Sequence, residues 1–95
     1  MKITEVKIRK VFSDRVLKAA VSITVGEHFV IHDVKIIQGR ERIFVAMPSR
    51  KDENGVYRDI VHPISEEFRQ AIEKAVLDEY YRYTADVRAQ ETDEN

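Results

Sequence analysis

The sequence has 95 residues and no cysteine, and its 16 Lys and Arg residues against 17 Asp and Glu residues give a formal net charge of −1. This length corresponds to one small domain, and the lack of cysteine excludes a disulfide scaffold, thiol catalysis and a thiolate metal site. A charged fraction of 35% beside 43% hydrophobic residues is typical of a folded, soluble protein.

The first 62 residues predict short strands. Residues 1–12 and 16–25 alternate apolar and polar side chains with a period of two, which is typical of antiparallel strands with one buried face. The three residues between them predict a hairpin. In residues 28–37, apolar side chains occur at both even-numbered and odd-numbered positions. That pattern indicates either a central strand covered on both faces or a strand bent by a bulge.

Residues 42–47 predict a fourth strand, which Pro48 ends because proline has no N–H to donate to a ladder. A polar loop is expected over residues 49–55, where Asn54 and Gly55 form a favourable turn dipeptide. Residues 56–61 then predict a fifth short strand.

The segment after Pro63 predicts one amphipathic helix, with Ser65 as its N-cap. Apolar side chains then recur at helical spacing, and only Glu79 interrupts the pattern. They are Phe68, Ala71, Ile72, Ala75, Val76, Tyr80 and Tyr83. We therefore expect an α+β fold, a meander-like antiparallel sheet of about five strands followed by a C-terminal amphipathic helix. A single domain over residues 1–84 would be followed by a polar, acidic tail over 85–95, frayed or disordered.

The net charge conceals a split along the chain. Residues 1–62 carry 12 basic and 8 acidic residues, which gives +4, whereas residues 63–95 carry 4 basic and 9 acidic residues, which gives −5. Two interpretations stay open at this point. The split marks either a basic binding face beside an acidic tail, or the ordinary solvated surfaces of strands and a helix.

No catalytic or metal-binding pattern is present in the sequence. His28 and His32 lie four residues apart on a predicted strand, which separates them by about 13 Å, and His62 precedes a proline, so all three are expected to be structural. No serine lies in a G-x-S-x-G elbow, and no glycine-rich phosphate loop occurs. We expect no enzymatic activity, no cofactor and no small-molecule substrate. The lack of a long apolar run and of a signal-peptide pattern predicts a cytoplasmic protein without a membrane segment.

One polar segment offers a binding hypothesis. Arg50 and Lys51 lie in the predicted loop and Arg58 in the returning strand, where it is expected near the surface that carries Arg50. Such cations can neutralise phosphates, and Tyr57 could add a stacking face. The alternative is a solvated hairpin tip, whose positive charge is offset by Asp52 and Glu53.

Several segments resemble the stage V sporulation protein G (SpoVG) family. They are F-V-A-M-P-S-R-K at 44–51, G-V-Y-R-D-I-V-H-P-I at 55–64, the opening residues 3–11, F-V-I-H-D-V-K-I-I at 29–37 and A-V-L-D-E-Y at 75–80. The resemblance covers residues 1–83, and its block at 44–64 is more specific than any single short motif.

The resemblance implies a homodimeric bacterial regulator that binds DNA, and RNA in some members, site-specifically and affects septation, sporulation or other gene expression. The family's paired loop cations correspond to Arg50 and Lys51, and its arginine before Asp-Ile corresponds to Arg58. Many relatives have the order Lys-Arg. The reversed order keeps both charges but moves the planar guanidinium fork by one residue.

Two further expectations follow from the residues themselves. The apolar runs at 29–37 and 43–47 exceed what one short helix can cover, which predicts a symmetric homodimer. The alternative function is a protein-interaction module that regulates cell division without binding nucleic acid. In that case Tyr81, which lies off the apolar stripe of the helix, is a candidate exposed anchor.

Overall fold

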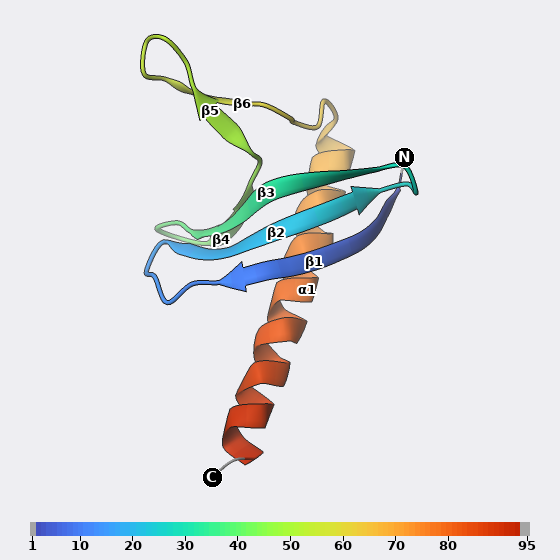
Figure 1. Ribbon diagram of the computed structural model, residues 1–95, viewed down its shortest axis with the longest axis vertical. Coiled ribbons are helices and arrows are strands. Elements are labelled where there is room, and N and C mark those ends of the chain that lie inside the picture. Colours follow the sequence, from blue (N-terminus) through green and yellow to red (C-terminus); the bar gives the residue numbers. More distant parts are fainter. Residues whose placement is uncertain (1, 94–95) are drawn as a thin grey trace.

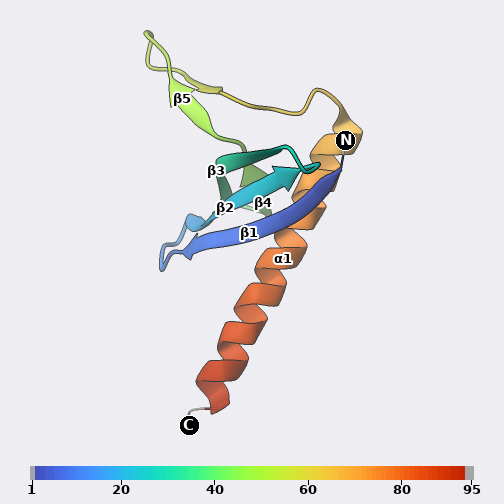
Figure 2. The same ribbon diagram turned by 45° about the vertical axis from the view of Figure 1, so that its right-hand side comes forward.

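The structure is a computed structural model that describes the backbone of residues 2–93 and the side chains up to residue 85. Four antiparallel strands form one sheet in the order β1-β2-β3-β4, and a single helix lies behind the sheet and crosses its strands (Figures 1 and 2). The bounds of these elements are β1 Ile3–Val11, β2 Leu17–Val25, β3 Phe29–Gln38, β4 Ile43–Ala46 and α1 Glu66–Asp93. The predicted α+β fold class is confirmed.

Two short strands lie outside this sheet. They are β5 Ser49–Lys51 and β6 Tyr57–Asp59, which pair only with each other. The expected polar loop therefore contributes a strand, and the expected fifth strand does not extend the main sheet. Pro48 explains this difference: it interrupts the ladder after β4, and its carbonyl accepts a hydrogen bond from the N–H of Ile60 at 2.8 Å, which starts a separate hairpin.

The turns of the main sheet depend on local hydrogen bonds. Asp14 lies between β1 and β2, and its carboxylate accepts hydrogen bonds from the backbone N–H groups of Leu17 at 2.7 Å and Val16 at 3.0 Å. These donors hold the pKa of Asp14 below its usual range. Gly26 follows β2 with a φ of 63°, a conformation in which glycine carries no Cβ penalty.

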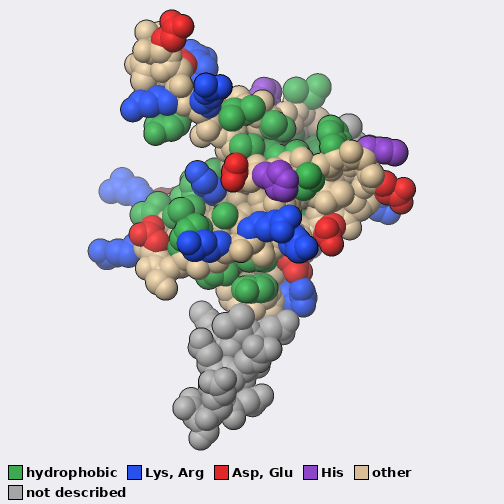
Figure 3. Space-filling view, in the orientation of Figure 1, with side chains coloured by type: hydrophobic (Ala, Val, Ile, Leu, Met, Phe, Trp, Pro, Cys, Tyr) green, Lys and Arg blue, Asp and Glu red, His purple; other side chains and the backbone are tan. Residues whose placement is uncertain are grey.

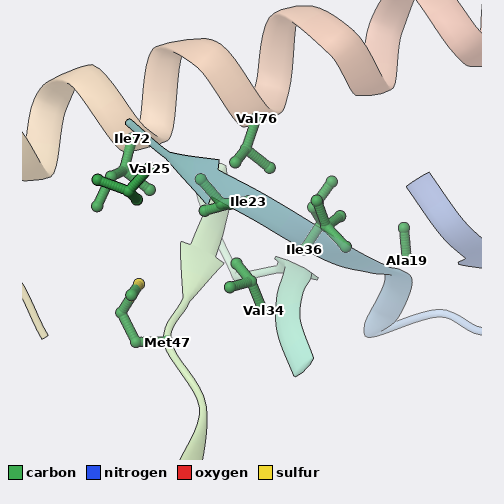
Figure 4. Close-up of a cluster of buried hydrophobic side chains, with 9 residues drawn as sticks. Ala19, Ile23, Val25, Val34, Ile36, Met47, Ile72 and Val76 are labelled. Atoms are coloured by element: carbon green, nitrogen blue, oxygen red, sulfur yellow. The ribbon is translucent and has the colours of Figure 1, made fainter. Parts of the chain in front are cut away.

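The core lies between the sheet and α1. Alternate residues of β2 point toward the helix, and their partners on β3 and α1 close the cluster, as Figure 4 shows for Ile23, Val25, Ile72 and Val76. The buried hydrophobic residues are Ala19, Val21, Ile23, Val25, Val34, Ile36, Met47, Ile72 and Val76. The period-two pattern predicted for β2 is therefore the pattern that fills the core.

A bulge explains why residues 28–37 are apolar in both of their alternating sets of positions. Val21 pairs with Val34 and Ile23 pairs with Ile31, so the single residue Ser22 faces two residues of β3. Within that bulge Asp33 has a φ of 63°, which reverses the side-chain alternation. Of the two readings that the sequence left open, the bulge is the one that the structure supports.

The helix begins as predicted. The Ser65 hydroxyl accepts a hydrogen bond from the N–H of Phe68 at 3.2 Å, which is the contact of an N-cap. The helix continues to Asp93 and so includes most of the segment expected as a polar tail, although the side chains after residue 85 lie outside the described part. Within the described chain, no helix has the length and apolar character needed to cross a membrane.

Candidate nucleic-acid interface

The predicted binding residues lie together on the β5–β6 hairpin, which projects away from the main sheet in Figure 1. The register of the two strands pairs Arg50 with Arg58 and Lys51 with Tyr57. Because paired residues of an antiparallel ladder share one face, Arg50 and Arg58 lie side by side. Lys51 and Tyr57 occupy the other face of the same hairpin.

Two arginines in direct opposition repel each other, and Asp52 compensates part of that charge. Its Oδ2 accepts a hydrogen bond from Arg58 Nε at 2.7 Å. Its Oδ1 accepts from the N–H groups of Asn54 at 2.9 Å and Val56 at 3.0 Å. Asp52 thereby orients Arg58 and closes the turn at Asn54 and Gly55. The bond from Arg58, and then that from Val56, holds the pKa of Asp52 below its usual range.

The opposite face of the hairpin combines a cation with an aromatic ring. Lys51 Nζ lies 5.8 Å from the centroid of the Tyr57 ring, within cation–π range. Tyr57 is 69% exposed, so one part of its ring surface is open to solvent. Within the described residues neither Arg50 nor Lys51 forms an ion pair. Both can therefore meet an anionic ligand without the loss of an ion pair in the described part of the chain.

Sequence reasoning missed the organising role of Asp52, which it treated only as a charge that offsets the basic residues. A signal was present, since an Asp two residues before an Asn-Gly turn commonly accepts hydrogen bonds from the turn's backbone. It also missed a set of cations that the strand register and a hydrogen bond place on the sheet face opposite α1, namely Lys7, Arg9, Lys10 and Lys35. Figure 3 shows Lys and Arg side chains over that face, around a histidine.

An apolar groove lies beside β3, between the sheet, the β6–α1 connection and the first turns of α1. Its volume is about 860 Å³, and its walls include Phe29, Met47, Ile60, Ile64 and Phe68. Phe29 is 56% exposed and Ile64 is 97% exposed. Such a cluster of uncovered large hydrophobic residues is typical of a protein–protein contact surface.

The serine and histidine residues form one close pair. Ser22 Oγ lies 2.8 Å from His32 Nδ1, and it also accepts a hydrogen bond from Arg9 Nε at 3.0 Å. Ser22 is 3% exposed, which withholds its hydroxyl from a substrate. Within the described residues no three His, Asp or Glu side chains converge as a metal site.

A model of the SpoVG family matches residues 1–82 of this sequence. The chain belongs to the SpoVG family. Relatives carrying the name "Putative septation protein SpoVG" include one from Clostridium novyi (strain NT), which is 52% identical over 80 residues, covering 84% of this chain and 80% of that protein. A second, from Clostridium perfringens (strain 13 / Type A), is 51% identical over 80 residues, covering 84% and 89% of the two chains. A third, from Lachnospira eligens, is 48% identical over 80 residues, covering 84% and 91%.

The family match confirms the resemblance seen in the sequence. It includes the whole β5–β6 hairpin, the groove and the main sheet of this SpoVG-family chain, and it ends within α1.

Proposed function

We propose that this SpoVG-family chain is a dimeric, cytoplasmic regulator that binds DNA site-specifically, with RNA as an alternative ligand, through the β5–β6 hairpin. The observation that carries the proposal is the placement of Arg50, Lys51 and Arg58 on one projecting hairpin beside the exposed Tyr57. The names of the relatives support a role in septation or sporulation.

The two faces of the hairpin suit different parts of a nucleic acid. Arg50 and Arg58 lie side by side, and a guanidinium fork can donate two hydrogen bonds to one phosphate or to a guanine edge. On the other face, Lys51 supplies a point charge while Tyr57 offers a ring on which an unpaired base can stack. Asp52 keeps Arg58 in place before the ligand arrives, which lowers the entropy lost on binding.

The test is a salt-dependent titration of a labelled oligonucleotide with the double variant Arg50→Ala/Lys51→Ala. Each lost phosphate contact removes about 0.9 from the slope of log K against log salt on duplex DNA. We therefore expect weaker binding and a slope shallower by about 1.8. A suitable control is Lys74→Ala, because Lys74 is an exposed lysine of α1 that pairs with Asp78. Unchanged affinity and slope in a folded double variant would refute the hairpin assignment.

We further propose that the apolar groove is the subunit contact of a homodimer. Its exposed Phe29 and Ile64 leave apolar surface that the described part of one chain does not cover. A second copy would bury this surface symmetrically. Sedimentation equilibrium at micromolar concentration should give twice the 11.1 kDa chain mass, and a species of one chain mass would contradict the dimer.

The same groove favours a second candidate function, a protein-interaction module that regulates cell division without binding nucleic acid. The oligonucleotide titration at two salt concentrations separates the two functions. Binding that persists near physiological salt supports the regulator. Binding confined to very low salt supports the interaction module, because nonspecific charge attraction disappears once higher salt screens it. We expect no catalysis, cofactor or small-molecule substrate for either one.

A further inference from the structure

The face of the main sheet opposite α1, called here the open face, carries several cations. Regular strand alternation would place some of them on the other face. In β1, Lys7 pairs with Ser22, Ile8 with Val21 and Lys10 with Ala20, so Arg9 is an extra residue in a bulge. Since Val21 is in the core, its neighbours Ala20 and Ser22 point to the open face. Lys7 and Lys10 therefore both lie on that face, although they are three residues apart.

Arg9 joins them through a hydrogen bond. Its Nε donates to Ser22 Oγ at 3.0 Å, which places the guanidinium on the open face as well. The bulge thus puts the consecutive cations Arg9 and Lys10 on one side of the sheet, where a regular strand would have separated them.

The bulge in β3 adds to the same surface. Lys35 pairs with Ala20 and so points to the open face, and His32 reaches the same face, with its Nδ1 2.8 Å from Ser22 Oγ. A regular strand would place residues 32 and 35 on opposite faces, but Asp33, with its φ of 63°, shifts the alternation between them. Two bulges on different strands therefore bring their cations to one surface.

The centre of the open face is ordered before any ligand arrives. Ser22 is 3% exposed, and its hydroxyl oxygen is held between Arg9 and His32. Arg9 uses its Nε in this contact. In the part of the chain that the structure describes, the two Nη groups of Arg9 make no hydrogen bond or ion pair, so they remain available as a donor fork.

The cations of the open face lack acidic partners. Among the described residues, Lys7, Arg9, Lys10 and Lys35 form no ion pair within 4.0 Å. Lys10 lies over the Phe12 ring at 5.1 Å. Glu5, which pairs with Thr24, is the acidic residue that the β1 register places on this face, and Asp33 is exposed within the bulge. The four cations against these two acids leave a net positive surface.

The dimensions of this surface suit a nucleic-acid strand. Lys7 and Lys10 are about 10 Å apart along β1, and Lys10 and Lys35 are about 10 Å apart across two strand spacings. A duplex strand presents one phosphate for each ~3.4 Å of helix axis, so an edge of the patch that lies along that axis spans about three phosphate positions. Figure 3 views this face and the β5–β6 hairpin from the same side, with basic side chains visible on both.

We propose that the open face is a second phosphate-binding surface, formed by Lys7, Arg9, Lys10 and Lys35 around Ser22 and His32, that holds the backbone of the nucleic acid engaged by the hairpin. This inference rests on the proposed nucleic-acid function and assigns a separate surface to it. The hairpin, with its arginine fork and aromatic ring, makes the contacts that distinguish bases. The open face adds contacts to phosphates, which strengthen binding without reading sequence.

The test uses the full chain and the double variant Lys7→Gln/Lys35→Gln, because neither lysine makes a hydrogen bond or ion pair in the described part that its loss could disrupt. Fluorescence anisotropy is measured with a labelled 30-base-pair duplex, and with one of its strands alone, between about 50 and 200 mM salt. Lys74→Gln on α1 is the matched control. For each variant, circular dichroism reports whether the chain is folded, and sedimentation reports whether it is a monomer or a dimer.

On duplex DNA we expect a log–log slope shallower by about 1.8, and on the single strand by about 1.4, with roughly five- to ten-fold weaker binding per lysine near 0.1 M salt. Discrimination between sequences should stay at the wild-type ratio, since phosphate contacts carry no base information. The Lys74→Gln chain should match the wild type in both respects.

Three results would overturn the open-face proposal. The first is an unchanged slope in a folded double variant. The second is a double variant that sediments with the mass of a single chain while the wild type sediments as a dimer, which would make this face a dimer contact. The third is unchanged oligonucleotide binding together with lost binding to phosphatidylserine vesicles, which would make it a membrane surface. If the wild-type chain binds no oligonucleotide at any salt, the proposed function itself fails. If the wild type binds and only Arg50→Ala/Lys51→Ala weakens it, the open-face inference alone fails.

Discussion

Asp52 connects the turn of the hairpin with its basic face. One carboxylate oxygen accepts hydrogen bonds from the backbone of the turn, and the other orients Arg58. A single half-buried residue thus determines both the shape of the tip and the direction of one of its three cations. Arg50 lies beside Arg58 in the ladder and forms no ion pair among the described residues.

The protonation of Asp52 should be visible at acidic pH. Its pKa is lowered in the folded hairpin, so its carboxylate stabilises the hairpin above the ordinary Asp pKa of about 3.9, and that contribution is lost as the pH falls through the lower folded value. The chemical shifts of the Asn54 and Val56 amide protons should therefore titrate with a midpoint below about 3.9.

The variant Asp52→Asn keeps an oxygen for the turn but removes the titrating charge, and we expect it to abolish this step. Glu53→Gln changes the neighbouring acid and should retain the step. A midpoint at or above the ordinary value in the wild-type chain would contradict the assigned role of Arg58.

At the scale of elements, the packing of α1 against the sheet forms the core of the domain. Ile72 and Val76 of the helix lie against the β2 side chains Ile23 and Val25 (Figure 4), and nearly all of their surface is removed from water. Burial of an aliphatic side chain of this size contributes about 1.5–3 kcal/mol. The helix contacts the core from Phe68 to Tyr80, about the first half of its length.

Truncation of the helix contact should weaken the whole fold. Ile72→Ala removes a side chain that is 3% exposed, and we expect a loss of about 2–5 kcal/mol in the free energy of unfolding, because a cavity remains. Urea denaturation followed by circular dichroism measures this change. Gln70→Ala, at an exposed position of the same helix, should stay within about 0.5 kcal/mol of the wild type. Equal stability of the two variants would show that the helix does not hold the core.

At the scale of the whole molecule, the acidic helix lies behind the sheet and the basic surfaces lie on the other side. The groove adjoins the open face, because His32 and Asp33 line it. The lysines and arginines of the two basic surfaces do not line the groove, so a dimer formed through the groove would not need to bury them. The proposed subunit contact and the proposed binding surfaces should therefore respond to different substitutions.

Ile64 provides the test of this separation. It is 97% exposed in the single chain, so Ile64→Asp should leave the chain folded while placing a charge in the proposed dimer contact. Sedimentation equilibrium should show a shift from dimer toward the 11.1 kDa chain. Val16→Asp changes an exposed hydrophobic residue in the β1–β2 turn and should leave the dimer intact. A dimer that survives Ile64→Asp would place the subunit contact elsewhere.

The sequence alone was sufficient for the features that depend on neighbouring residues. Alternation in residues 16–25 predicted the core face of β2, Ser65 predicted the helix start, and the segments at 44–64 pointed to the SpoVG family. Local periodicity and short motifs carry this information because the chain's own geometry sets which residues share a face.

Only the tertiary structure decided what depends on bulges and on the pairing of distant strands. Pro48 could end β4 in the sequence, but the separation of β5 and β6 from the main sheet became visible only in the pairing. Likewise, the alternation of residues 1–12 and 28–37 could not place Arg9, Lys10 and Lys35 on one face, because a bulge inserts one residue and reverses every later side chain. A net charge of −1 can thus coexist with a cationic surface, because the register between strands sets where each charge lies.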